Sequence, residues 1–140
     1  MDAGFDVEWE PNSEHAFLSV GDGGTAILRL NPNRSDADRR LILMRWSGVR
    51  AARMEDPNDE ARSGHPLYNY GLRDVLWIGE VLDSSLIAEI EARNSVHPQH
   101  SSERFALLRH WIVPLKGSVV EVVARSCEVT RVEPVRVDRG

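Results

Sequence analysis

Two apolar runs near the C-terminus, 107–115 and 118–124, are separated only by Lys116 and Gly117. A connection this short joins antiparallel neighbours, because a parallel pair needs a crossover of a dozen or more residues. The sequence therefore predicts a β-hairpin. A turn of two or four residues would place Val113 opposite Val120.

The rest of the chain repeats this pattern of short apolar segments between turn signals. The run Gly21-Asp22-Gly23-Gly24 is a strong turn signal, so its two flanking segments are predicted to form another hairpin. The flanking segments are 15–20 and 25–30, and the further segments with strand-like composition are 5–10, 40–46, 75–82, 127–132 and, more weakly, 49–54. Not every one of these segments needs to form a strand, and we expect seven or eight strands in all.

Only one segment has a clear helical pattern. Residues 84–94 carry apolar side chains on one face, Asp83 or Ser84 is placed to cap the start, and His97-Pro98 ends the pattern. Residues 101–106 could add one helical turn. One main helix cannot supply parallel βαβ units, so we predict an α+β fold. The expected form is a strongly bent, mainly antiparallel sheet or a small barrel, with the helix covering one face or end.

Length and charge restrict the classes of protein and partner. A chain of 140 residues is the usual size of a single domain, with a frayed tail expected at 134–140. The formal charge of −5 argues against nucleic acid as a principal partner. Lys116 is the only lysine. The arginines are scattered along the sequence, which favours a compositional origin for them over arginine-specific recognition.

Cysteine content and hydropathy favour a cytoplasmic protein. Cys127 is the only cysteine, so no intramolecular disulfide and no cysteine-based zinc site is expected, and we predict a small core or half-exposed residue there. No apolar run reaches the 18 residues of a membrane span, and 1–10 lacks the features of a signal peptide. The sequence therefore predicts no membrane partner.

The segment 56–74 differs from its surroundings. It has no strand or helix period, yet it contains several apolar residues, so we expect an ordered loop that packs over the sheet. His65, Tyr68 and Tyr70 are candidates for lining the mouth of a small-molecule site. The alternative is that the tyrosines seal the end of the sheet with their hydroxyls in water.

The predicted C-terminal hairpin brings two ionisable side chains together. With a turn of two or four residues, alternation places His110 and Glu121 on the same face as diagonal neighbours, within reach of long side chains. A three-residue turn would place them on opposite faces. Four valines surround Glu121 in the sequence, so its carboxylate should have a partner or a raised pKa, as at acid–base sites. The alternatives are a buried pair that only stabilises the sheet, and a Glu121 that faces water.

Glu80 is the third candidate catalytic residue. In the predicted buried strand 75–82 it would share a face with Leu76, Ile78 and Leu82, where a glutamate is unexpected. It is a candidate general base or ligand anchor. The alternative is that it reaches solvent near the strand end.

The histidines form a weaker signal for ligand binding. His97 and His100 are added to His65 as candidate ligand contacts, since imidazoles exchange protons near neutral pH. His97 and His100 follow the predicted helix with a proline between them, so they lack the fixed spacing of a helical metal-binding pair. No phosphate-binding, dinucleotide, nucleophile-elbow or calcium motif is present. The sequence predicts no metal and no cofactor.

Three functions remain open at this point. The first is a small-molecule-binding domain, extending to a cofactor-free acid–base enzyme of cyclase, isomerase or lyase type, with a pocket between the sheet and the 56–74 loop. The second is a protein-interaction module of immunity, antitoxin or accessory-subunit type, which small size, acidic charge and exposed sheet edges would suit. The third is a metalloenzyme that uses the histidines. Assembly into homo-oligomers is compatible with each of them.

Overall fold

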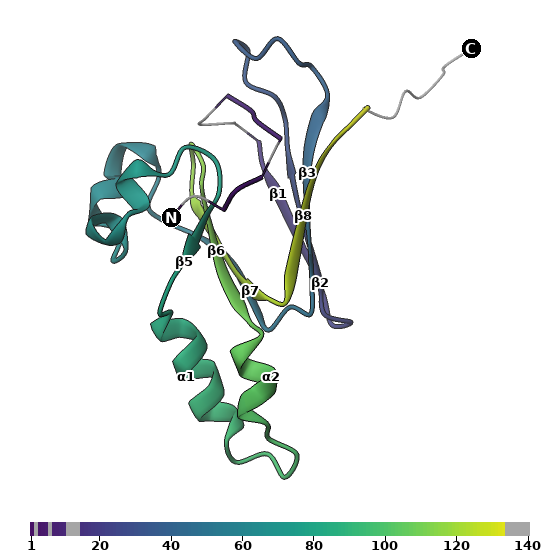
Figure 1. The fold of residues 1–140 in the computed structure, drawn as a ribbon. Coiled ribbons are helices and arrows are strands. Elements are labelled where there is room, and N and C mark those ends of the chain that lie inside the picture. The colour runs from purple at the N-terminus through teal and green to yellow at the C-terminus, as the bar shows by residue number, and fades with distance from the viewer. Residues whose placement is uncertain (2, 6, 11–14, 134–140) are drawn as a thin grey trace.

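The computed structural model describes residues 1, 3–5, 7–10 and 15–133. This part of the chain contains two antiparallel sheets of four strands each, in the orders β1-β2-β3-β8 and β4-β7-β6-β5 (Figure 1). The strands are β1 (Phe17–Gly21), β2 (Thr25–Leu30), β3 (Leu41–Ser47), β4 (Ala51–Glu55), β5 (Gly79–Val81), β6 (Arg109–Pro114), β7 (Val119–Ala124) and β8 (Ser126–Val132). The predicted α+β class is confirmed, but the sheets are not closed into a barrel.

The main core lies between the two sheets. Leu28, Ile42 and Trp46 of the first sheet and Trp111 and Val122 of the second belong to one cluster of buried side chains. The chain passes between the sheets twice, from β3 to β4 and from β7 to β8, and these two connections lie together (Figure 1). Two backbone hydrogen bonds tie them, from Arg50 N to Val123 O (2.8 Å) and from Arg125 N to Ser47 O (3.0 Å).

The predicted C-terminal hairpin is confirmed in its register. In β6 and β7, Val113 lies opposite Val120, Ile112 opposite Glu121 and His110 opposite Val123. Because side chains alternate, Trp111 and Val122 enter the core between the sheets, whereas His110 and Glu121 project from the other face of the second sheet.

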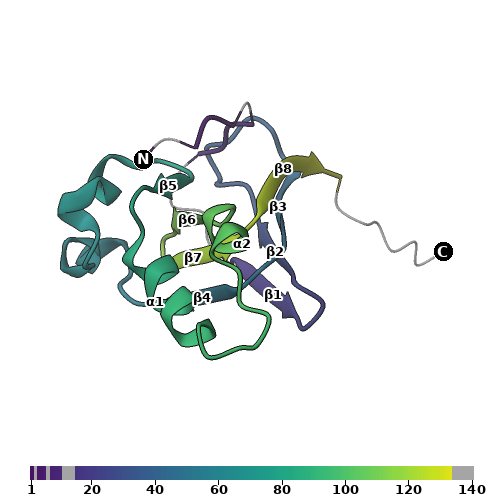
Figure 2. The ribbon, with the colours of Figure 1, turned by 60° about the horizontal axis from the view of Figure 1, so that its bottom comes forward.

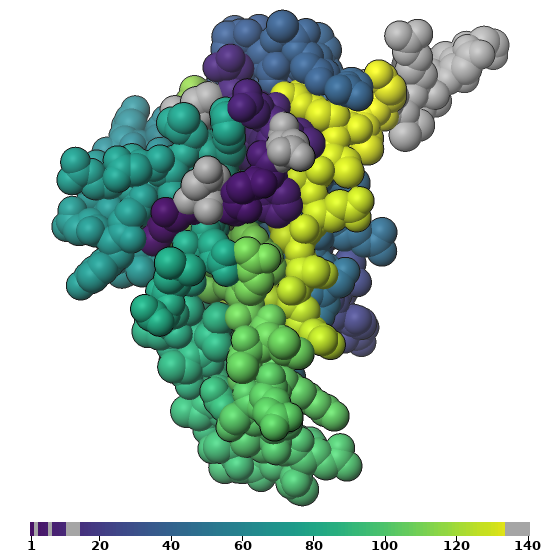
Figure 3. All heavy atoms as spheres, viewed as in Figure 1, coloured from purple at the N-terminus to yellow at the C-terminus, as the bar shows by residue number. Residues whose placement is uncertain are grey.

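Two helices follow β5 and project from one end of the second sheet (Figures 1 and 3). Helix α1 (Ser85–Asn94) matches the predicted helix, and α2 (Ser102–Ala106) matches the predicted extra turn. Apolar side chains of α1, including Ile87 and Ile90, pack against Phe105 and Leu108. None of the described helices is long and apolar enough to cross a membrane.

The 56–74 loop is ordered, as expected. It folds into three short 3-10 helices, η1 (Asp59–Gly64), η2 (Tyr68–Tyr70) and η3 (Leu72–Asp74). Leu72 is buried against Ile112 and Val119, so the loop packs on the outer face of the second sheet.

Two strand predictions are wrong, and the prediction made for the C-terminal tail falls outside the described residues. No strand forms in the described part of 5–10, because Trp9 is buried in the core and its ring lies 5.8 Å from that of Trp77 instead of joining a sheet edge. The predicted buried strand 75–82 shortens to β5, and Leu76 and Leu82 are 61% and 77% exposed. The expected frayed tail, 134–140, lies outside the described residues.

One arginine joins three separate segments. The buried guanidinium of Arg131 in β8 donates hydrogen bonds to the carbonyl oxygens of Glu8 (2.6 Å) and Arg40 (3.0 Å), and it pairs with the carboxylate of Asp36 at 2.8 Å. These contacts fix the N-terminal segment and the connection between β2 and β3 against β8.

Candidate functional site

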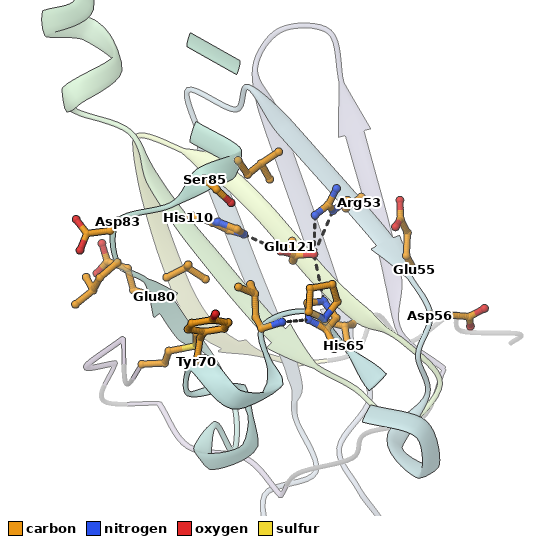
Figure 4. A pocket seen from close by; sticks show the side chains of 17 residues that line it. Arg53, Glu55, Asp56, His65, Tyr70, Glu80, Asp83, Ser85, His110 and Glu121 are labelled. Atoms are coloured by element: carbon orange, nitrogen blue, oxygen red, sulfur yellow. Dashed lines mark hydrogen bonds and ion pairs between the residues drawn. The ribbon is translucent and has the colours of Figure 1, made fainter. Parts of the chain in front are cut away.

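A pocket of about 790 Å³ lies on the outer face of the second sheet. Its walls come from β4, the 56–74 loop, β5 and the start of α1, and it lies where sequence analysis predicted a site (Figure 4). Glu121 and His110 line it from β7 and β6. We refer to it as the Glu121 pocket.

The Glu121 carboxylate is the centre of a polar network in this pocket. The residue is only 5% exposed. Its Oε1 atom contacts His110 Nε2 at 2.9 Å, and its Oε2 atom accepts hydrogen bonds from Arg53 Nε (3.2 Å) and Nη2 (3.0 Å). His65 Nε2 lies 3.5 Å from the same Oε2 (Figure 4).

The network holds Glu121 in its charged form. Burial by itself would raise the pKa of this carboxyl, but the hydrogen bond from His110 and the charge of Arg53 outweigh burial and lower the pKa to about 2. Of the two alternatives given by the sequence, the structure shows the first: Glu121 has partners, and its pKa is lowered and not raised.

Helix α1 positions His110 through its capping residue. The hydroxyl of Ser84 accepts a hydrogen bond from Ile87 N (3.1 Å) and lies 2.7 Å from His110 Nδ1. Ionised Glu121 can only accept, so His110 Nε2 is the donor of the bond to it, and we assign the Ser84 hydroxyl proton to the bond with Nδ1. In this arrangement neutral His110 carries its proton on Nε2 and donates it to Glu121.

His65 approaches Glu121 in the same tautomer. Its Nδ1 accepts a hydrogen bond from Leu67 N at 3.0 Å, so the ring proton of the neutral side chain is on Nε2, facing Glu121. An Nε2 that carries a proton has no lone pair for a metal ion. Within the described ranges, no group of three or more histidine, cysteine, aspartate or glutamate side chains is arranged to hold one.

Glu80 lines the pocket at its β5 wall but is separate from the Glu121 network. It forms a two-pronged ion pair with Arg109, from Nε to Oε1 (2.8 Å) and from Nη2 to Oε2 (2.5 Å). The hydrogen bond from Arg109 outweighs partial burial and lowers the pKa of Glu80. A carboxylate held in this way is a weak base, which argues against Glu80 as a general base.

The predicted ligand contacts are only partly brought together. Tyr70 lines the mouth of the pocket, whereas Tyr68 is half-buried and does not line it. His97 and His100 lie between α1 and α2, outside the pocket lining. His100 Nδ1 lies 2.9 Å from Asn94 Oδ1, and the His97 Nδ1 accepts a hydrogen bond from Gln99 N, which are local contacts of that turn.

Two side chains that contact Glu121 or His110 were missed from the sequence. Arg53 lies opposite Glu121 in the β4–β7 pairing, and Ser84 was recognised only as a candidate helix cap. Arg53 could have been found only from the register of β4 against β7. No short connection joins these two strands, so the sequence does not fix that register.

Comparisons of the chain with protein-family models, with curated proteins and with solved structures gave no match.

Proposed function

We propose that this chain is a cytoplasmic small-molecule-binding protein that takes its ligand into the Glu121 pocket. The observation that carries the proposal is a charged, almost fully buried carboxylate, in contact with two imidazoles and a guanidinium, on the wall of a pocket of about 790 Å³. Small-molecule sites combine a concave apolar wall with a few convergent polar groups.

Arg53 is the group best placed to meet a ligand. Its side chain is nearly half exposed and lines the pocket, and only Nε and Nη2 are used by Glu121. Within the described residues, Nη1 makes no polar contact. The apolar walls include Leu67, Val81 and Leu86. We therefore expect a ligand with an apolar body and a hydrogen-bond acceptor that reaches Arg53.

Acid–base catalysis of cyclase, isomerase or lyase type is the extension of this proposal. The proton would be carried by His110 or His65, and ionised Glu121 would stabilise the imidazolium, as a carboxylate does behind a catalytic histidine. Both ring nitrogens of each histidine have partners in this structure. Proton transfer would therefore require a ligand that displaces one of those partners, whereas binding alone does not.

A fragment screen observed by ¹H–¹⁵N NMR tests the proposal. We expect fragments with an apolar ring and an acceptor group to shift the backbone amides of 65–70 and 80–86 in a saturable manner. The Arg53→Gln variant should weaken these responses by about ten-fold, the cost of one hydrogen bond to a charged group. The matched control is Arg73→Gln, which changes an exposed arginine outside the pocket lining.

The proposal fails if no fragment gives a saturable response at these amides, or if Arg53→Gln and Arg73→Gln respond alike. Both outcomes are read on the folded protein, because the same spectra report whether each variant keeps its fold.

A protein-interaction module is the second candidate, and one observation favours it. Tyr70 and Leu82, at the mouth of the pocket, are 78% and 77% exposed. A partner that covered the mouth would bury both side chains. In that case Tyr70→Ser with Leu82→Ser would abolish partner binding, while Arg53→Gln would leave it nearly unchanged.

A further inference from the structure

Three arginines that are far apart in the sequence line one groove at the C-terminal end of α2. Arg50 lies in the connection from β3 to β4, Arg104 lies in α2, and Arg125 lies between β7 and β8. The groove has a volume of about 440 Å³, and its remaining walls are Gly48, Val49, Leu107 and Leu108. Figures 1 and 2 show the end of α2 beside the two connections between the sheets. We call this the arginine groove.

The charge of the groove is not compensated by the protein. No acidic residue lines it, and within the described residues none of the three arginine side chains forms an ion pair. This holds in a chain with 22 acidic and 17 basic residues. Like charges placed together repel one another, so a surface of this kind is stabilised by an anion. The scattered positions of the arginines in the sequence concealed this grouping.

Two of the arginines are held in place by the fold. The Arg50 guanidinium lies 4.9 Å from the centre of the Phe105 ring, which is buried. Gly48 has a φ of +68°, and a Cβ there would lie 2.7 Å from the Cγ of Arg125. The stem of Arg125 therefore lies directly over the glycine. Side chains held in this way lose less entropy on binding than freely moving ones.

We propose that the arginine groove binds a phosphoryl group or a similar multiply charged oxyanion carried by a small molecule. Guanidinium groups match the oxygen geometry of phosphate with two parallel hydrogen bonds each. The apolar side chains of Val49, Leu107 and Leu108 would contact the uncharged part of the ligand. This site is separate from the Glu121 pocket and does not depend on the function proposed there.

Titration with sodium phosphate and sodium pyrophosphate at constant ionic strength tests the proposal. We expect saturable shifts of the backbone amides of 48–50, 104–108 and 125 in ¹H–¹⁵N spectra, with pyrophosphate binding more tightly than phosphate. Arg104→Gln combined with Arg125→Gln should weaken pyrophosphate binding by about ten-fold or more, since charge-assisted hydrogen bonds are lost. Arg34→Gln is the matched control, because Arg34 is exposed and lies outside the groove.

A second variant separates geometry from net charge. Gly48→Ala keeps all three arginines but places a methyl group against Arg125, so we expect weaker pyrophosphate binding with unchanged total charge. If the double variant failed to fold, the two single arginine variants would decide the question, because alanine at the positive φ of Gly48 is itself strained.

Several results would overturn the proposal. They are shifts that rise linearly without saturation, an equal loss of binding in Arg34→Gln, and unchanged binding in the arginine variants. A single-stranded RNA and vesicles that contain an anionic phospholipid are tested in parallel. Binding to either of these without a saturable response to pyrophosphate would also overturn it.

Discussion

Glu121 connects Arg53, His65 and His110 through one buried carboxylate. Its carboxylate is buried but has contacts on both oxygens, so the cost of burying the charge is met by hydrogen bonds and by Arg53. Removing the charge would leave the guanidinium of Arg53 and two imidazoles directed at a neutral group. The network therefore contributes to stability, and it lines the pocket proposed to bind a ligand.

The pH dependence of stability should reveal this charge. The folded-state pKa of Glu121, about 2, lies below the ordinary value of 4.5, so ionised Glu121 stabilises the fold above pH 4.5, and this stabilisation is lost as the pH falls towards 2. We expect Glu121→Gln to lower the unfolding free energy by about 2 kcal/mol at pH 7. The gap between variant and parent should close in acid, as measured by urea denaturation.

Glu60→Gln is the control for that measurement, since Glu60 is exposed and outside the pocket lining. It should change the unfolding free energy by less than about 0.5 kcal/mol. A gap for Glu121→Gln that stays constant between pH 7 and pH 3 would show that the carboxylate charge is not its source.

The sequence predicted one of the partners of Glu121 and missed the others for a physical reason. His110 and Glu121 belong to one hairpin, whose short turn fixes the register, so their contact follows from local pattern. Arg53 and His65 reach the carboxylate from a strand and a loop whose placement depends on non-local packing. His65 could be nominated as a ligand contact, but not as a contact of Glu121.

At the scale of elements, α1 connects to the pocket through its N-cap residue, Ser84. The Ser84 hydroxyl both caps the helix and contacts His110, so the start of the helix and the orientation of the imidazole are coupled. The local sequence signal predicted the cap, because serine before an apolar helical pattern is a common start. It could not predict the contact with β6.

Replacing Ser84 should therefore have two separable effects. We expect Ser84→Ala to lower the unfolding free energy by about 1 kcal/mol through loss of the cap. It should also change the tautomer populations of His110, which ¹⁵N shifts of the ring nitrogens report. Ser84→Thr keeps the hydroxyl and should restore the tautomer. Ser85→Ala should leave it unchanged, and an unaltered His110 in Ser84→Ala would refute the coupling.

The two errors in element prediction share a cause. Alternation at 5–10 and apolar content at 75–82 are typical of strands, but the two segments pack on one another, with Ala3 N donating to Ile78 O at 3.4 Å and Trp9 against Trp77. Aromatic packing between two irregular segments takes the place of strand pairing. The strand propensity of a short sequence segment contains no information about a packing partner elsewhere in the chain.

At the scale of the whole molecule, the fold depends on the core between the sheets. The antiparallel class and seven of the eight strands follow from local patterns and short turns. The division into two sheets does not, because it depends on the pairings of β3 with β8 and β4 with β7, which join distant parts of the chain.

Substitutions of two leucines test how much of the unfolding free energy comes from that core. Leu28 is fully buried between the sheets, whereas Leu76, predicted from sequence to be buried, is largely exposed. We expect Leu28→Ala to lower the unfolding free energy by about 3 kcal/mol and Leu76→Ala by less than about 1 kcal/mol. Comparable losses, measured by urea denaturation, would contradict the observed packing of 75–82.

From the contacts of Arg131 we expect three regions of the chain to unfold locally as one unit. Because a single guanidinium holds the carbonyl groups of Glu8 and Arg40 together with the carboxylate of Asp36, none of these regions can detach without breaking the same group of bonds. Amide hydrogen exchange in the N-terminal segment, the β2–β3 connection and the end of β8 should therefore follow one shared opening free energy. Loss of this side chain would remove the link between the three regions and leave each to open with its own remaining contacts.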